Sequence, residues 1–226
     1  MAMKLLFARH AEMQGDPYAC PPPPVHGCLS ARGAAQALRA QRAMAGTRID
    51  AALVSPYGRA VETAQVILQG RALTPHLCDF LREWLPNDAL RQLPAVQHAE
   101  VMRRHENTYV EEQWKTELGE GCFDMYARIC PPFLAALRAH GIHRRMGGFV
   151  LDPPAHDTHV LVVAHGGTLN VLLCFLLGLP PFPLGKFAFE LTGLATLVFI
   201  EQMGIFYPQL VIPAAADPTP APPPGP

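Results

Sequence analysis

The chain has 226 residues, half of them hydrophobic, and its formal net charge at pH 7 is only -1. This length suits one large domain that can bury its core without disulfides or metals. The near-neutral charge excludes a general electrostatic attraction to nucleic acid or to an anionic membrane surface.

The first predicted element is a buried strand over residues 3–8, where the sequence is a short apolar run. It stops at Arg9 and His10. A polar loop follows, and its Pro21–Pro24 run favours an extended backbone without hydrogen bonds. We interpret this run as a surface spacer.

A helix is predicted to begin after Ser30, because a serine side chain can accept from the unpaired amides of the first turn. It should run to about Ala45 and stop at Gly46. The alanines and Leu38 are expected on its buried side.

The second strand is predicted over 49–54, and Ser55 and Pro56 after it form a helix-start signal. That second helix should end near Gly70. A third strand is expected over 73–77.

A charged segment from about 85 to 119 is predicted to be a helical cap inserted into the domain. The sequence over 123–140 then indicates a helix. Pro131 and Pro132 must kink or divide that helix, because each removes a backbone donor and crowds the preceding turn.

The clearest buried strand covers residues 159–164, and it is followed by Gly166, Gly167 and a predicted helix over 168–177. A last strand is expected over 195–200. The alanine- and proline-rich tail over 213–226 has almost no large apolar side chain, which predicts disorder.

Strands that alternate with helices predict an α/β fold in which helices cover both faces of the sheet. We expect a three-layer α/β/α sandwich with a mostly parallel central sheet, formed as a single domain over residues 1–212.

Three of the predicted strands end beside side chains that suit an anion: Arg9 and His10, Ser55 and Arg59, and His165. In open α/β sheets, ligands collect at the carboxyl ends of the strands, where helix amides favour anions. Arginine forks suit phosphate, and histidines exchange protons or attack near neutral pH. The pattern therefore favours phosphate chemistry.

The sequence also resembles the histidine phosphatase (phosphoglycerate mutase-like) superfamily in five segments that follow the order of that family. They are Leu6–Glu12 (LFARHAE), Leu29–Ala37 with Ser30, Gly33 and Gln36, Ser55–Ala64 (SPYGRAVETA), Leu81–Glu83 (LRE) and Val163–Gly167 (VAHGG). The resemblance covers most of residues 4–175.

The resemblance implies a phosphatase that needs no metal or other cofactor. It implies that His10 attacks phosphorus and forms a phosphohistidine, while Arg9, Arg59 and His165 surround the phosphate oxygens. It also implies that Glu83 protonates the leaving oxygen and later takes a proton from water.

The acid–base residue is the least secure of these assignments, because acidic side chains are common in loops. Four other residues stay open as substitutes for Glu83, namely Glu12, Asp88, Glu100 and Glu106.

Two residues depart from the family pattern. Ala11 replaces the glycine that usually follows the catalytic histidine, and Met13 stands where the mutases carry a serine. The lost hydroxyl disfavours mutase activity and favours a phosphatase. The compact cap and the absence of a recruiting module favour a small phosphorylated metabolite as its substrate. A phosphoglycerate-type mutase, a non-catalytic phosphate-ligand binder and a scaffold that acts through its proline segments stay as alternatives, and a homodimer stays open.

The chain is expected to be cytoplasmic and to have no membrane partner. The apolar start meets Arg9 too early for a signal-peptide core, and the apolar run over 160–181 is interrupted by His165 and Asn170. The six cysteines are dispersed without a CxxC pair, which favours reduced thiols.

Overall fold

The computed structural model describes residues 2–15, 28–105, 115–116, 118–182 and 185–212. The Pro21–Pro24 run, Glu106 and the tail over 213–226 lie outside these ranges. Within them, no helix is long and apolar enough to cross a membrane. The five cysteines that they include are buried thiols.

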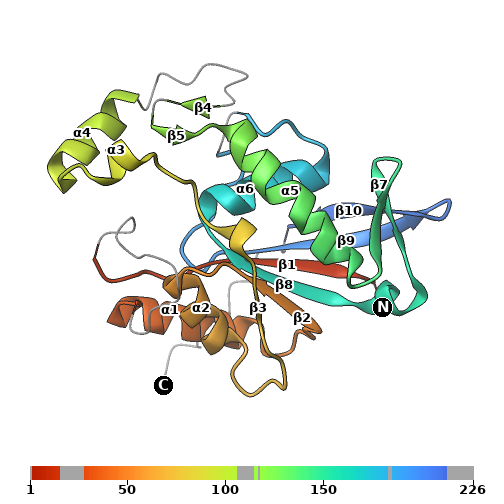
Figure 1. The fold of residues 1–226 in the computed structure, drawn as a ribbon. Helices are drawn as coiled ribbons and strands as arrows, with labels where there is room; N and C mark the ends of the chain where they lie inside the picture. The colour runs from red at the N-terminus through yellow and green to blue at the C-terminus, as the bar shows by residue number, and fades with distance from the viewer. Residues whose placement is uncertain (1, 16–27, 106–114, 117, 183–184, 213–226) are drawn as a thin grey trace, which may run out of the picture.

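The elements alternate along the chain as expected for an α/β fold (Figure 1). The strands are β1 (Lys4–Arg9), β2 (Ala51–Val54), β3 (His76–Leu77), β4 (Lys115–Thr116), β5 (Gly119–Glu120), β6 (Ile142–Arg145), β7 (Gly148–Leu151), β8 (His159–Ala164), β9 (Leu194–Gln202) and β10 (Ile205–Val211). The helices are α1 (Ala31–Ala43), α2 (Gly58–Ile67), α3 (Asp88–Arg91), α4 (Ala95–His105), α5 (Cys122–Arg138) and α6 (Gly166–Leu177), with short 3₁₀ turns η1 (Asp79–Leu81) and η2 (Pro153–Asp157).

Eight strands form the central sheet in the order β3-β2-β8-β1-β9-β10-β7-β6. The first four run parallel, and the remaining four pair antiparallel, so the sheet is mixed. The antiparallel half arises because β6–β7 and β9–β10 are hairpins with two-residue turns, Met146-Gly147 and Met203-Gly204, whose residues all have positive φ. The parallel arrangement that we predicted holds for the half of the sheet that includes β1, β2 and β8.

Side chains from the two faces of the sheet enter separate cores. Along β1, Leu5 and Phe7 belong to the core that includes α5 and α6, whereas Leu6 and Ala8 belong to the core that includes α1 and α2. This alternation is the period of two expected for a strand buried on both faces. The predicted three-layer α/β/α sandwich is confirmed, with α1 and α2 on one face and α5 and α6 on the other (Figure 1).

Helix α1 begins after Ser30, whose hydroxyl accepts from the Gly33 amide at 2.9 Å, as predicted. The expectation for Leu38 was wrong, because this side chain is 41% exposed. Of the alanines in α1, only Ala37 and Ala40 are buried, and Gly33 and Gln36 complete the buried side.

Helix α2 begins only at Gly58, without a side-chain cap, and thus later than the predicted start at Ser55 and Pro56. Of the two alternatives predicted for α5, a kink or a division, the division is excluded, because the helix continues through Pro131 and Pro132. Pro131 has no N–H to donate to the carbonyl of Ala127, four residues earlier. Both residues are exposed, so water can satisfy that carbonyl.

The segment that we propose as a cap leaves and rejoins the domain at one place. It includes α3 and α4, and its two ends are joined by backbone hydrogen bonds from Asn87 to Leu118 (2.7 Å) and from Glu120 to Leu85 (3.0 Å). Its base is therefore fixed beside the start of α5.

The loop after His10 is held against the start of α1. The Ser30 amide donates to the Glu12 carbonyl, and the Glu12 amide donates to Gln36 Oε1. A Cβ atom at Gly33 would overlap the Glu12 carbonyl oxygen. Only glycine lets the helix approach this closely.

We expect Gly33→Ala to lower the free energy of unfolding by about 1–3 kcal/mol, because this overpacking outweighs the gain in helix propensity. Gly46→Ala is the matched control, since a Cβ atom there meets nothing within 4 Å. Urea unfolding of both variants measures the difference. Equal stability of the two variants would contradict the proposed close packing of α1 against the Glu12 carbonyl.

Candidate active site

The parallel half of the sheet brings the predicted residues to one edge. β2, β8 and β1 are adjacent and parallel, so their carboxyl ends lie side by side. Arg9 ends β1 and His10 follows it, Ser55 follows β2, and His165 follows β8. Helices α2 and α6 begin at the same edge, where their free amides favour an anion.

His10 is buried, with only 7% of its surface exposed. Its Nδ1 lies 2.7 Å from the carbonyl oxygen of Ala11. Because a carbonyl only accepts, Nδ1 carries the proton, and Nε2 keeps its lone pair. Burial lowers the pKa of His10 to about 3, with further lowering from Arg59 and Arg9 and opposition from the Ala11 hydrogen bond. The ring is therefore neutral at physiological pH.

Arg59, in the first turn of α2, lies between the two histidines. Its Nε is 3.2 Å from His10 Nε2 and 3.3 Å from His165 Nδ1, so one N–H is shared by two acceptor nitrogens. Its guanidinium lies 4.9 Å from the centroid of the Tyr57 ring. Its Nη1 lies 3.7 Å from Met13 Sδ, which places this thioether beside the guanidinium.

His165 is fully buried, and its ring centroid lies 5.0 Å from that of His10. Since Nδ1 accepts from Arg59, the proton lies on Nε2, which donates to Ser55 Oγ at 2.7 Å. Burial is the main reason that the pKa of His165 is far below its ordinary value, and His10 and the arginines lower it further.

Arg9 extends from β1 across the start of α6. Its Nη1 donates to the carbonyl of Phe189 at 2.5 Å. Its Nε is buried and has no hydrogen-bond partner among the described residues. A buried, unsatisfied guanidinium N–H is costly unless an acceptor reaches it. A phosphate oxygen would satisfy this donor.

Glu83 reaches the same edge from the loop after η1. Its two carboxylate oxygens accept from the backbone amides of Trp84 (2.9 Å) and Gly167 (3.1 Å). A Cβ atom at position 167 would lie 2.6 Å from Glu83 Oε1, so the glycine makes room for the carboxylate. The structure thus brings Glu83 to the start of α6.

The described substitutes for Glu83 have other surroundings. Glu12 accepts from Ser30 Oγ and lies 3.6 Å from Arg32. Glu100 pairs with Arg104 on α4, and Asp88 lies in the first turn of α3. Glu12 and Glu100 are thus each paired with an arginine outside the histidine site.

Sequence reasoning missed the contact of Ser55 with His165. It assigned the serine to a helix cap, whereas the register of β2 with β8 pairs Val54 with Val163 and brings Ser55 beside His165. The sequence signal was Ser55 itself, a small polar residue directly after β2, the neighbour of the strand that precedes His165. Parallel pairing of the two strands had to be known first.

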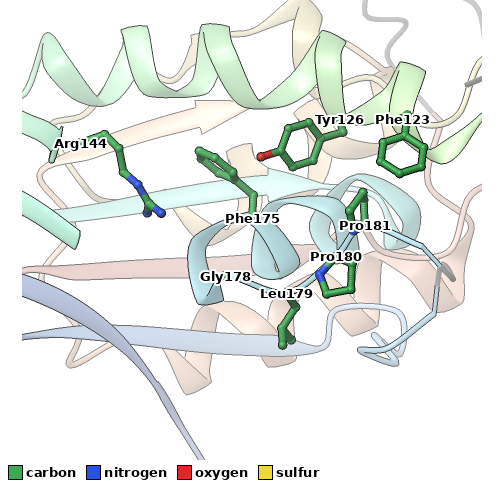
Figure 2. Close-up of a pocket in the computed structure, with 8 residues that line it drawn as sticks. All are labelled: Phe123, Tyr126, Arg144, Phe175, Gly178, Leu179, Pro180 and Pro181. Atoms are coloured by element: carbon green, nitrogen blue, oxygen red, sulfur yellow. The ribbon is translucent and has the colours of Figure 1, made fainter. Parts of the chain in front are cut away.

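A separate cavity of about 490 Å³ lies at the C-terminal end of α6, whereas His165 precedes the N-terminal end of that helix (Figure 2). Aromatic rings from α5 and α6 line it together with Arg144 of β6. The lining residues are Phe123, Tyr126, Arg144, Phe175, Gly178, Leu179, Pro180 and Pro181. The cavity shares none of the candidate catalytic side chains.

Residues 5–206 match the family model of the histidine phosphatase superfamily (branch 1). Two bacterial adenosylcobalamin/alpha-ribazole phosphatases are similar in sequence. That of Salmonella typhimurium is 24% identical over 92% of this chain and all of the relative, and that of Escherichia coli is 27% identical over 79% of this chain and 81% of the relative.

Solved structures share the fold. A putative alpha-ribazole-5'-P phosphatase from Escherichia coli has a TM-score of 0.67 and 25% identity, covering 93% of this chain and 96% of its own. A mycobacterial glucosyl-3-phosphoglycerate phosphatase complexed with VO3 has a TM-score of 0.68 and 23% identity, covering 95% of this chain and its entire own chain.

The lowered pKa values of His10 and His165 predict that stability falls as the solution becomes acidic. Below about pH 6.5 the unfolded chain takes up protons at both rings, whereas the folded chain does not until far lower pH. The free energy of unfolding should therefore fall with decreasing pH, by up to about 1.4 kcal/mol per pH unit for each histidine.

Urea unfolding in phosphate-free buffer at pH 7 and about pH 5.5 measures this effect. The His10→Asn and His165→Asn variants, which lack the titrating rings, should each lose stability less steeply on acidification than the wild type. If the variants and the wild type follow the same pH dependence, the neutral-histidine account is wrong.

Proposed function

The chain belongs to the histidine phosphatase superfamily, and from this membership and the geometry of the site we propose that it hydrolyses a small phosphorylated metabolite through a phosphohistidine at His10. The observation that carries the proposal is the state of the His10 ring. Its Nδ1 proton is held by the Ala11 carbonyl, and its Nε2 lone pair faces Arg59. A neutral nucleophile thus lies where an anion is attracted.

In the first step, the phosphate group of the substrate takes over the donors of Arg59 and Arg9. His10 Nε2 attacks phosphorus in line, the new P–N bond forms and the ester P–O bond breaks. Glu83 gives its proton to the departing ester oxygen, which leaves as an alcohol. The Ala11 carbonyl stabilises the positive charge that develops on the ring.

In the second step, a water molecule attacks the phosphorus of the phosphohistidine. Glu83 takes a proton from this water, the P–N bond breaks, and His10 returns to its neutral form as inorganic phosphate leaves. Arg9, Arg59 and His165 offset the charge that shifts over the phosphate oxygens in both steps. The proposed steps require no metal.

The substrate class is proposed from the relatives and from the site. Two similar proteins are named for the phosphates of α-ribazole and adenosylcobalamin. The contact of Met13 with Arg59 supports hydrolysis over mutase chemistry, because the thioether offers no donor to a phosphate. Aryl phosphates and small metabolite phosphates form the panel to assay.

We expect the purified protein to hydrolyse p-nitrophenyl phosphate in the presence of a chelator. His10→Ala should lower kcat by more than about a thousandfold, because it removes the nucleophile. His76→Ala, at an exposed histidine of β3, is the matched control and should leave kcat unchanged.

Turnover that persists in His10→Ala, or that disappears on chelation, would rule out the proposed mechanism. An inactive wild type that still binds phosphate or vanadate would instead support the non-catalytic binder. Loss of activity or of a partner on removal of residues 214–226 would support a role of the proline-rich tail.

A further inference from the structure

Glu83 lies in a loop, between η1 and α3, rather than on a helix or strand. A catalytic acid must be held within a fraction of an ångström of its working position, and loops alone hold side chains less firmly than regular elements do. Something outside the loop must therefore fix its backbone. The structure shows one side chain that contacts the loop at several points.

That side chain is Arg128, in the middle of α5. Its Nη1 donates to the carbonyls of Phe80 (3.0 Å) and Arg82 (3.2 Å), and its Nη2 donates to the carbonyl of Glu83 itself (3.3 Å). Three carbonyls around the acid residue thus converge on one guanidinium. A planar group with five fixed donors suits this arrangement, whereas the compact ammonium of a lysine does not.

Glu120 holds the guanidinium from the opposite side. Its carboxylate accepts from Arg128 Nε at 2.5 Å and from Nη2 at 2.8 Å, so the pair is bidentate. The side chains are only 16% and 14% exposed, unlike surface ion pairs that contribute little. Buried ion pairs often add little net stability compared with apolar side chains, which favours a role in geometry.

The same pair reaches the other side of the loop. Glu120 Oε2 accepts from the Leu85 amide at 2.9 Å, and the Glu120 carbonyl accepts from the Trp84 indole at 2.7 Å. Every residue from Arg82 to Leu85 is therefore bonded to Arg128 or Glu120. A further contact comes from α6, where Thr168 Oγ1 donates to the Arg82 carbonyl at 2.7 Å.

We propose that Arg128, held by Glu120, is the positioning residue that fixes the Glu83 loop so that the Glu83 carboxyl group meets the leaving oxygen of the substrate. This inference rests on the proposed function, in which Glu83 is the general acid. Arg128 acts through the backbone of residues 80–83, because its guanidinium donates to the carbonyls of this loop. It therefore governs protonation of the leaving group and leaves phosphate binding intact.

The test compares two substrates with different leaving groups. p-Nitrophenolate is a stable anion and leaves with little help, whereas the alkoxide of an alkyl phosphate such as glycerol 2-phosphate needs a proton. Arg128→Met should lower kcat/KM for the alkyl phosphate by about 10- to 100-fold, the typical cost of a misplaced catalytic group. Because kcat/KM reports the steps up to release of the leaving group and not the later hydrolysis of the phosphohistidine, kcat/KM for p-nitrophenyl phosphate should fall by less than about threefold.

Glu83→Gln provides the reference for the acid itself. It should show the same leaving-group dependence with a larger loss, about 10²–10⁴-fold for the alkyl phosphate. In the Glu83→Gln background, Arg128→Met should cause no further selective loss, because both substitutions remove one function. The inhibition constant of inorganic phosphate should stay unchanged in Arg128→Met.

Arg144→Met is the matched control for the loss of a partly buried arginine. Its guanidinium lies 4.9 Å from the ring centroid of Phe149 and 5.3 Å from that of Phe175, and Arg144 and Phe175 line the separate cavity (Figure 2). It should affect both substrates equally. If Arg128→Met fails to fold, Arg128→Lys and Glu120→Gln give the same readout, and each should slow the alkyl phosphate selectively.

Equal losses on both substrates in the Arg128 variants, or a selective loss that persists in the Glu83→Gln background, would overturn the positioning role. An outcome in which Glu83→Gln itself is not selective would overturn the acid assignment and this inference with it. The His10 nucleophile would be untouched by that result, so the two failures are distinguishable.

Discussion

One N–H group of Arg59 lies between the acceptor nitrogens of His10 and His165, and the rest of the site depends on this arrangement. Burial, and after it the arginine charges, keep both rings neutral, and the Ala11 carbonyl and Ser55 hydroxyl hold the protons on the outer nitrogens. The positive charge therefore stays on the Arg59 guanidinium, which can reorient towards a bound anion, while His10 Nε2 keeps its lone pair. The three side chains meet only because β2, β8 and β1 are adjacent and parallel.

Three of the arginines serve two separate purposes in our proposal. Arg9 and Arg59 lie at the edge where phosphate is expected, and Arg9 Nε has no acceptor among the described residues. Arg128 has its donors turned to Glu120 and to the carbonyls of the loop that carries Glu83. In our proposal, the first pair binds the reacting group and Arg128 aligns the acid. Substitutions of the phosphate-binding arginines and of Arg128 should therefore impair different parts of the reaction.

The sequence was sufficient for the parts of the fold and site that depend on local patterns. Apolar runs that end at Arg9, His10 and His165 predict both the buried strands and the residues at their ends, and the structure brings these residues together. The three-layer fold followed from the alternation of strands and helices. Leu38 was misplaced because hydrophobicity alone did not give the phase of α1.

Other features depend on contacts between distant segments and could not be read from local patterns. Arg128 lies 45 residues from Glu83, and nothing near it in the sequence distinguishes it from the other arginines. The β6–β7 and β9–β10 hairpins turn at Met-Gly pairs, which lack the usual Asn-Gly or Asp-Gly signal. Ser55 was misread because its partner lies 110 residues away.

The most direct test of the central claim is to trap the covalent intermediate. The protein is mixed with a phosphorylated substrate, quenched in alkali within the first turnovers, digested, and examined by mass spectrometry. The account predicts one alkali-stable, acid-labile phosphoryl group on the peptide that contains His10, at its Nε2 atom. Turnover with an unmodified His10 peptide, or a phosphoryl group on another residue, would contradict it.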